Sequence, residues 1–165
     1  MCLQDKVSDP VSVEVDHMRQ PLSGPAKDVA VLISRVLVGV VLFAHGYEKI
    51  FTWGFAGASA RFARIGVPLP PVSVGYASVV ELIGGPLLIA GAATTIVSAL
   101  AVLDMLGACL TTGAYTTVFV ENHGFELEAT IGAVALLLLF TGAGRFSIDH
   151  LLLSRRRAVL APDSA

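Results

Sequence analysis

Long apolar segments constrain this chain more than any other feature of its sequence. They occupy residues 28–51, 73–93, 95–119 and 129–143. About 20 helical residues, rising roughly 1.5 Å each, cross the hydrocarbon core of a bilayer. Lipid offers the backbone no hydrogen bonds, so a spanning segment must be a helix or belong to a closed barrel. The sequence therefore predicts an all-α integral membrane protein, built as a four-transmembrane-helix bundle.

The composition agrees with a membrane protein. Of the 165 residues, 55% are hydrophobic and 15% are charged, whereas about a quarter of the residues in soluble domains are charged. The formal net charge is −2, and the basic residues form no surface large enough for nucleic acid, so we expect no nucleic-acid partner. Cys2 lies in a polar stretch and Cys109 in an apolar one. We therefore expect no disulfide, and a packing role for Cys109.

The flanks of the apolar segments divide the chain into three regions. Residues 1–27 are polar and interrupted by prolines, which predicts a mobile cytoplasmic tail. Residues 28–150 form the membrane domain, and residues 151–165 form a basic cytoplasmic tail. The Ala58–Ala60 stretch after the first segment also fits a signal anchor, but the polar start and the further apolar segments disfavour that alternative.

Basic residues predict the orientation in the membrane. An even number of spans leaves both termini on one side of the bilayer. That side holds most of the lysines and arginines, namely Lys6, Arg19, Lys27, Arg145, Arg155, Arg156 and Arg157. Cytoplasmic loops are enriched in lysine and arginine, so both termini are predicted to be cytoplasmic. We interpret residues 155–157 as a topology determinant with mild attraction to anionic lipid.

Ionisable residues inside the apolar segments are the strongest functional signal. On a helical wheel of the first segment, Arg35, His45 and Lys49 fall within an arc of about 80°, whereas Glu48 points to the opposite face. A charge at the bilayer centre costs at least ~2.5–3.5 kcal/mol on insertion scales, so this polar seam should face the bundle interior. Two glycines border the seam and would permit close approach of another helix, namely Gly39 and Gly46.

The depth of each ionisable residue predicts its partner. Arg35 and Asp104 lie about 10 Å and 13 Å from the same, inner end of their segments. Glu81 lies about 12 Å from the outer end of its own segment, nearer to His45 and Lys49. We therefore predict an inner buried ion pair of Arg35 with Asp104 and an outer layer of His45, Lys49 and Glu81. A pair of Arg35 with Glu81 is the competing alternative.

The two layers are expected to differ in role. Paired charges in a membrane can fix the register of helices without any further function. We favour this structural role for Arg35 with Asp104. For His45, Lys49 and Glu81 the structural and the functional interpretation both stay open, because ionisable groups inside a membrane are usually functional.

No metal site is predicted. A histidine and several acidic residues follow the third segment, namely Glu121, His123, Glu126 and Glu128. Their spacing is not diagnostic of a ligand set, so we favour a solvated acidic loop, with Glu128 reaching outward to the headgroups. His45 and His123 would flank a haem only across a large cavity, which the sequence does not indicate.

Several short motifs follow one another along the chain. Arg35 precedes His-Gly-Tyr-Glu-Lys at 45–49, and later motifs are Arg-Ile-Gly-Val-Pro at 64–68, Glu-Leu-Ile-Gly-Gly at 81–85 and Gly-Arg-Phe-Ser-Ile-Asp at 144–149. In this order they resemble the DoxX family of small bacterial membrane proteins. The resemblance covers about residues 28–150. One departure is Ala143, where the family often has proline.

The resemblance implies a four-span protein of the bacterial plasma membrane. The family name comes from a subunit linked to thiosulfate:quinone oxidoreduction. Some actinobacterial members look like anchors that assemble a sulfurtransferase and a superoxide dismutase into a redox complex. Carried over to this chain, the positions that would matter are Arg35, His45, Lys49, Glu81 and, as an interface residue, Arg145.

Two functional hypotheses follow. The first is a membrane subunit of a redox complex, which holds a quinone or thiol carrier against His45, Lys49 and Glu81. The sequence contains no recognisable cofactor ligand set or redox-active cysteine pair, so whether the chain is itself an enzyme stays open, and its catalytic residues are unknown. The alternative is a non-enzymatic scaffold or assembly factor that recruits soluble redox enzymes. A solute carrier is disfavoured because no inverted repeat is recognisable, and a homo-oligomer stays open.

Overall fold

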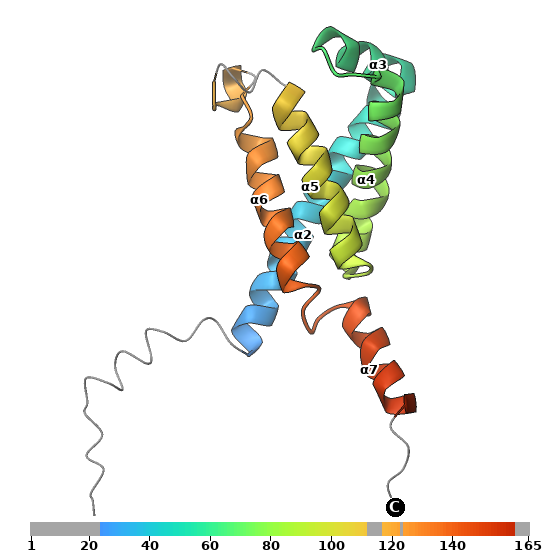
Figure 1. The fold of residues 1–165 in the computed structure, drawn as a ribbon, viewed down its shortest axis with the longest axis vertical. Helices are drawn as coiled ribbons and strands as arrows, with labels where there is room; N and C mark the ends of the chain where they lie inside the picture. The colour runs from blue at the N-terminus through green and yellow to red at the C-terminus, as the bar shows by residue number, and fades with distance from the viewer. Residues whose placement is uncertain (1–23, 112–116, 123, 161–165) are drawn as a thin grey trace, which may run out of the picture.

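The computed structural model describes residues 24–111, 117–122 and 124–160, and all regular structure within these ranges is helical (Figure 1). Residues 1–23, which make up most of the predicted N-terminal tail, lie outside the described part of the chain, as do Cys2 and His123. Four helices, α2, α4, α5 and α6, run side by side as a bundle (Figure 1). The predicted helical bundle is therefore present.

The first apolar segment forms helix α2, Pro25–Tyr47, which continues without a break into the π-helical turn η1, Glu48–Thr52. Pro25 stands at the start of α2, where its missing N–H has no intrahelical acceptor in any case. π-helical turns often occur at functional sites because they reorient side chains. Lys49 lies in this turn.

The next two apolar segments form a tight hairpin of α4, Pro70–Ala90, and α5, Thr94–Thr111. Gly91 ends α4 in the left-handed conformation, at φ 69°. In the described part of the chain, three helical stretches are long and apolar enough to cross a membrane, namely Pro25–Thr52, Pro70–Ala90 and Thr94–Thr111.

The predicted third segment, 95–119, extends too far. Helix α5 ends at Thr111, residues 112–116 lie outside the described ranges, and residues 117–119 are not helical. The carbonyl of Phe119 instead accepts the N–H groups of Asn122 and Gly124 at 3.0 and 2.9 Å. These bonds turn the chain back through η2, Val120–Asn122, towards the last helix of the bundle.

Helix α6, Glu126–Thr141, corresponds to the predicted segment 129–143 and packs against α5 and α2. It ends at Gly142, whose φ of 74° suits glycine. The core of the bundle is apolar and includes the fully buried side chains of Leu42, Leu88 and Ala101.

Two helices were not predicted. Helix α3, Gly54–Arg64, lies in the loop after η1 and packs on α4 at one end of the bundle (Figure 1). Helix α7, Ile148–Leu160, lies at the opposite end, where residues 151–165 were expected to form a tail (Figure 1). A cap begins α7, because the hydroxyl of Ser147 accepts the N–H of His150 at 3.1 Å.

Glycines bring α2 and α4 into direct backbone contact. A Cβ atom on Gly39 would lie 2.6 Å from the Gly85 carbonyl oxygen, and one on Gly85 would lie 2.6 Å from the Gly39 carbonyl oxygen. One on Gly46 would lie 2.6 Å from the Leu82 nitrogen. The close approach expected from Gly39 and Gly46 is therefore present, and α4 is the helix that approaches.

We predict that Gly39→Ala destabilises the bundle, because its methyl group would overlap the α4 backbone. Overpacking of this kind costs about 1–3 kcal/mol. The matched control is Gly107→Ala, since a Cβ atom at this α5 position has nothing within 4 Å. Thermal unfolding in mild detergent, followed by circular dichroism, should show a lowered midpoint only for Gly39→Ala. Equal midpoints for the two variants would contradict the packing argument.

Candidate functional site

The end of the bundle next to α7, called the inner end after the predicted orientation, is organised around Arg35, whose side chain is fully buried. Its Nη1 donates to the Ala143 carbonyl oxygen at 2.5 Å, and its Nη2 donates to the Phe146 carbonyl oxygen at 2.7 Å. Both acceptors lie in the turn between α6 and α7. One guanidinium group therefore ties the middle of α2 to the end of α6.

The turn between α4 and α5 closes over the same group. A Cβ atom on Gly91 would overlap Arg35 Nη1 and lie 2.6 Å from Ser147 Cβ, and the φ of 69° also favours glycine at this position. The Asp149 carboxylate accepts hydrogen bonds from the N–H groups of Ala93 and Thr94 at 2.8 and 2.9 Å. The backbone N–H of Asp149 donates to the Gly91 carbonyl at 3.0 Å. The start of α5 is therefore capped by a residue of α7.

The side chain of Thr94, the first residue of α5, does not provide this cap. The Thr94 hydroxyl is buried and has no hydrogen-bond partner among the described residues. The sequence signal for the real cap is the Gly-Arg-Phe-Ser-Ile-Asp motif at 144–149. Its aspartate can be identified as a cap only after the fold brings the two turns together.

The predicted ion pair of Arg35 with Asp104 is wrong, and so is the competing pair of Arg35 with Glu81. Arg35 donates instead to backbone carbonyls, one of them immediately beyond the end of α6, where helical carbonyls have no intrahelical partner and the helix dipole is negative. Asp104 lies in a cavity with Glu81 and Lys49.

Arg145 lies in the same turn and points largely to the surface. Its backbone N–H donates to Asp28 Oδ1 at 3.1 Å, and its Nε lies 4.0 Å from Asp28 Oδ2. Because the Arg145 side chain is 71% exposed, this ion pair contributes little to stability. The residue expected to form an interface therefore helps to fasten the turn to the start of α2.

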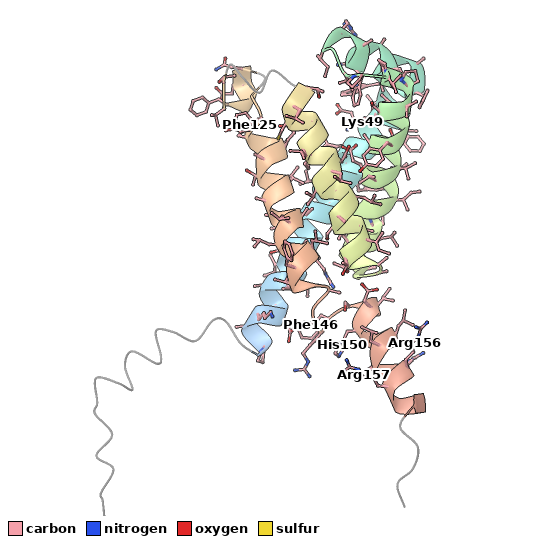
Figure 2. The ribbon with its side chains drawn as sticks, in the orientation of Figure 1. Lys49, Phe125, Phe146, His150, Arg156 and Arg157 are labelled. Atoms are coloured by element: carbon pink, nitrogen blue, oxygen red, sulfur yellow. The ribbon has the colours of Figure 1, made fainter. Side chains whose placement is uncertain are left out.

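At the opposite end of the bundle, Lys49 pairs with Glu81 (Figure 2 labels Lys49). Lys49 Nζ lies 2.8 Å from Glu81 Oε1 and 2.5 Å from Oε2. Glu81 is 4% exposed, and the Lys49 side chain is 12% exposed. The contact expected between the η1 lysine and the α4 glutamate is therefore present, as a buried and charge-assisted pair.

Two cavities adjoin this ion pair, and both are lined by Lys49 and Glu81. The larger one, of about 450 Å³, lies among α3, α4 and α5 and has mostly apolar walls, including Phe62, Ile65 and Leu103. The smaller one, of about 260 Å³, extends towards α2 and α6. The ion pair therefore lines both spaces.

The larger cavity contains a carboxylate that the predicted outer layer did not include. Asp104 lines it and is 9% exposed, and its Oδ2 atom has no hydrogen-bond partner among the described residues. Tyr76 also lines this space, and its hydroxyl donates to the Leu100 carbonyl at 2.7 Å. The depth estimate placed Asp104 in the inner layer because the third segment was expected to run to residue 119. Helix α5 ends at Thr111, so Asp104 lies only about 10 Å from its outer end.

The smaller cavity contains His45 and Glu128 besides the ion pair. No hydrogen bond or ion pair joins His45 to Lys49 or Glu81 in the described part of the chain. Glu128 does not reach outward to the headgroups as expected, because its Oε2 atom is buried and without a partner among the described residues. The outer polar layer therefore extends over α2, α4, α5 and α6.

No group of three or more histidine, cysteine, aspartate or glutamate residues that could hold a metal ion lies within the described ranges. His123, which the haem alternative requires, lies outside them. Cys109 is a free, half-buried thiol in α5. Lys49, Glu81, Asp104 and His45 line the two cavities, and these side chains can form hydrogen bonds and exchange protons there.

Comparison with known proteins assigns the family. Residues 30–114 match the DoxX family. The chain belongs to the DoxX family. This match includes Arg35, Lys49, Glu81 and Asp104, so both polar clusters begin within the family-matched part of the chain.

Curated relatives cover most of the chain. It is 32% identical over 122 residues to a Bacillus subtilis protein named "Putative oxidoreductase CatD", covering 74% of this chain and 86% of that protein. It is 30% identical to the uncharacterized membrane protein Rv3486 of Mycobacterium tuberculosis, over 78% of this chain and 85% of the relative. It is 28% identical to the inner membrane protein YphA of Escherichia coli, over 77% of this chain and 93% of that relative. No solved structure matches the chain significantly.

These relatives and the apolar helices agree on location. Two of the similar Escherichia coli proteins, YphA and YqjF, are inner membrane proteins. This DoxX family member is therefore a multi-span protein of the inner, or plasma, membrane.

We predict that Arg35→Met lowers the free energy of unfolding by about 3 kcal/mol or more, because two charge-assisted hydrogen bonds are lost and two carbonyls lose their donor. The control is Arg64→Met, since Arg64 is exposed on α3 and bonds only to the nearby Ala60 carbonyl. Thermal unfolding in detergent gives the stability. Proteolysis of the turn at 142–147 should accelerate only in Arg35→Met, and equal behaviour of the two variants would contradict this role.

We predict that the Lys49–Glu81 pair is strongly coupled. Lys49→Met leaves a buried carboxylate without its cation, a change that costs about 3–5 kcal/mol in comparable pairs. The double variant Lys49→Met/Glu81→Leu removes both charges and should recover part of that loss. Unfolding midpoints of the wild type, both single variants and the double variant complete the cycle. Additive losses would show that the two residues act independently.

Proposed function

We propose that this DoxX family protein is a membrane subunit of a redox complex, and that a quinone or thiol-linked electron carrier binds against Lys49 and Glu81. The observation that supports this proposal is the buried ion pair in the wall of two adjoining cavities. Ligand sites are typically apolar cavities with a few convergent polar groups. The larger cavity has this composition.

The chemistry of the pair suits a carrier whose oxygen gains negative charge on reduction. Lys49 has three N–H donors, so it can keep a bond to Glu81 and donate another to a ligand oxygen. In an apolar cavity such a donor stabilises an oxyanion more than it would in water. Glu81 and Asp104 are positioned to exchange protons with the same ligand.

One relative supports the redox assignment. CatD is named as an oxidoreductase candidate. The chain contains two cysteines, and of these only Cys109 lies in the described part, where it is unpaired. We therefore propose that electrons pass between the bound carrier and a soluble redox enzyme that docks on the membrane subunit.

We further propose that α6 is a fourth span and that both termini lie in the cytoplasm. Helix α6 packs beside α5 and α2 within the bundle. Its 16 residues rise about 24 Å, which a locally thinned bilayer accommodates. Lys27, Arg145 and the arginines of α7 all lie at the inner end of the bundle, as the positive-inside rule requires.

A fluorescence titration tests ligand binding. Trp53 is the single tryptophan of the chain and lines the smaller cavity. We expect a short-chain ubiquinone or menaquinone analogue to quench its emission in a saturable way. Glu81→Gln should weaken binding about tenfold or more, because it removes the partner that orients Lys49. Glu48→Gln is the matched control, since Glu48 lines neither cavity.

The alternative function, a scaffold without a carrier, gives different results. Quenching would then be absent or unsaturable, and equal in Glu81→Gln and Glu48→Gln. Soluble enzymes would still co-purify with the wild type and with Glu81→Gln in mild detergent. That combination of results would reject the carrier site and leave the scaffold.

A further inference from the structure

A second polar site lies at the inner end of the bundle, far along the helices from Lys49 and Glu81. A groove of about 810 Å³ runs between the start of α2, the start of α5, the turn after α6 and helix α7. The turn that forms its floor is the one held by Arg35. Its shape therefore depends on the fold and not on a mobile surface loop.

Cations from three separate parts of the chain line this groove. Lys27 comes from α2, Arg145 from the turn, and Arg156 from α7, with His150 beside them (Figure 2 labels His150 and Arg156). Neither Lys27 nor Arg156 forms an ion pair with another described residue. Lys27 and Arg156 therefore bring positive charge to the groove without an ion-pair partner in the described part of the chain.

The two carboxylates in the groove are already engaged. Both oxygens of Asp149 accept backbone N–H groups at the start of α5. Asp28 accepts the N–H of Arg145 and lies within 4.0 Å of its guanidinium group. These bonds leave Lys27 and Arg156 available to an external anion.

The groove also has apolar walls, which a small inorganic anion would not contact. Ile96, Leu152 and Leu153 line it and are 66%, 53% and 55% exposed. These side chains continue the apolar surface of the spans to the level at which the cations begin. A molecule that matches both parts has an anionic phosphate and a hydrocarbon chain.

We propose that this groove binds one anionic phospholipid, with its phosphate between Lys27 and Arg156 and an acyl chain along Ile96, Leu152 and Leu153. The bound lipid would link α7 to the bundle, since within the described residues only the first turn of α7 is fastened, through Asp149. This proposal is independent of the carrier site at the other end.

A lipid titration of the full chain in mild detergent tests the proposal. Dioctanoyl phosphatidylglycerol should bind at one site per chain by native mass spectrometry and raise the unfolding midpoint. Arg156→Gln and Lys27→Gln should each weaken binding about five- to tenfold. Arg157→Gln is the matched control, because Arg157 is exposed on the same helix but does not line the groove. Its affinity should equal that of the wild type.

Three results would overturn the proposal. Equal binding of dioctanoyl phosphatidylcholine would show that negative charge is not selected. Full competition by glycerol 1-phosphate at equal concentration would indicate a small-anion site that does not use the apolar wall. Equal losses in Arg156→Gln and Arg157→Gln would indicate diffuse attraction to the arginine run. The exposed position of Arg156 means that its replacement should leave the unfolding midpoint without lipid unchanged, which the same measurement checks.

Discussion

The two hydrogen bonds from Arg35 to the turn after α6 are the interaction on which the rest of the arrangement depends. A guanidinium group cannot give up its charge, so inside a membrane protein it must find acceptors. It finds them at a helix end, where carbonyls are available. The same turn places the Asp149 carboxylate at the start of α5. The turn between α4 and α5 leaves room for the Arg35 side chain because residue 91 is glycine. One buried charge thereby fixes the relative positions of α2, α5, α6 and α7.

The opposite end of the bundle uses charge differently. Lys49 and Glu81 satisfy each other, but the cavities on both sides leave them within reach of a third molecule. The glycine contact between α2 and α4 sets their separation, since a Cβ atom on Gly46 would lie 3.0 Å from Glu81 Cβ. Helix α3 then covers this end, and its Phe62 side chain lines both cavities. Backbone carbonyls therefore satisfy Arg35 at the inner end, whereas cavities adjoin Lys49 and Glu81 at the outer end.

The sequence predicts well whatever depends on pattern alone. Apolar length predicted the bundle helices, helical periodicity predicted that Arg35 faces the interior, and the cost of a charge in the bilayer predicted the burial of Glu81. It predicts poorly those contacts in which a side chain bonds to the backbone, because a backbone partner does not depend on residue type. Arg35 was paired with Asp104 because a carboxylate is visible in a sequence, whereas the carbonyls of Ala143 and Phe146 look like those of every other residue. Helices α3 and α7 were not predicted because each is a short segment beside a long apolar one, and such segments are easily taken for a loop or a tail.

The position of Asp104 favours the proposed carrier site over a purely structural pair at the outer end. A pair that only fixes register is most stable when its charges balance and every polar atom has a partner. Lys49 already has one carboxylate in contact, yet Asp104 Oδ2 and Glu128 Oε2 are also buried there, each without a partner among the described residues. Such carboxylate oxygens destabilise a bundle unless a proton or a ligand satisfies them. Two such carboxylates in the cavities that Lys49 lines therefore favour the proposed site, at which a bound molecule would exchange protons with them, over a contact that only holds helices together.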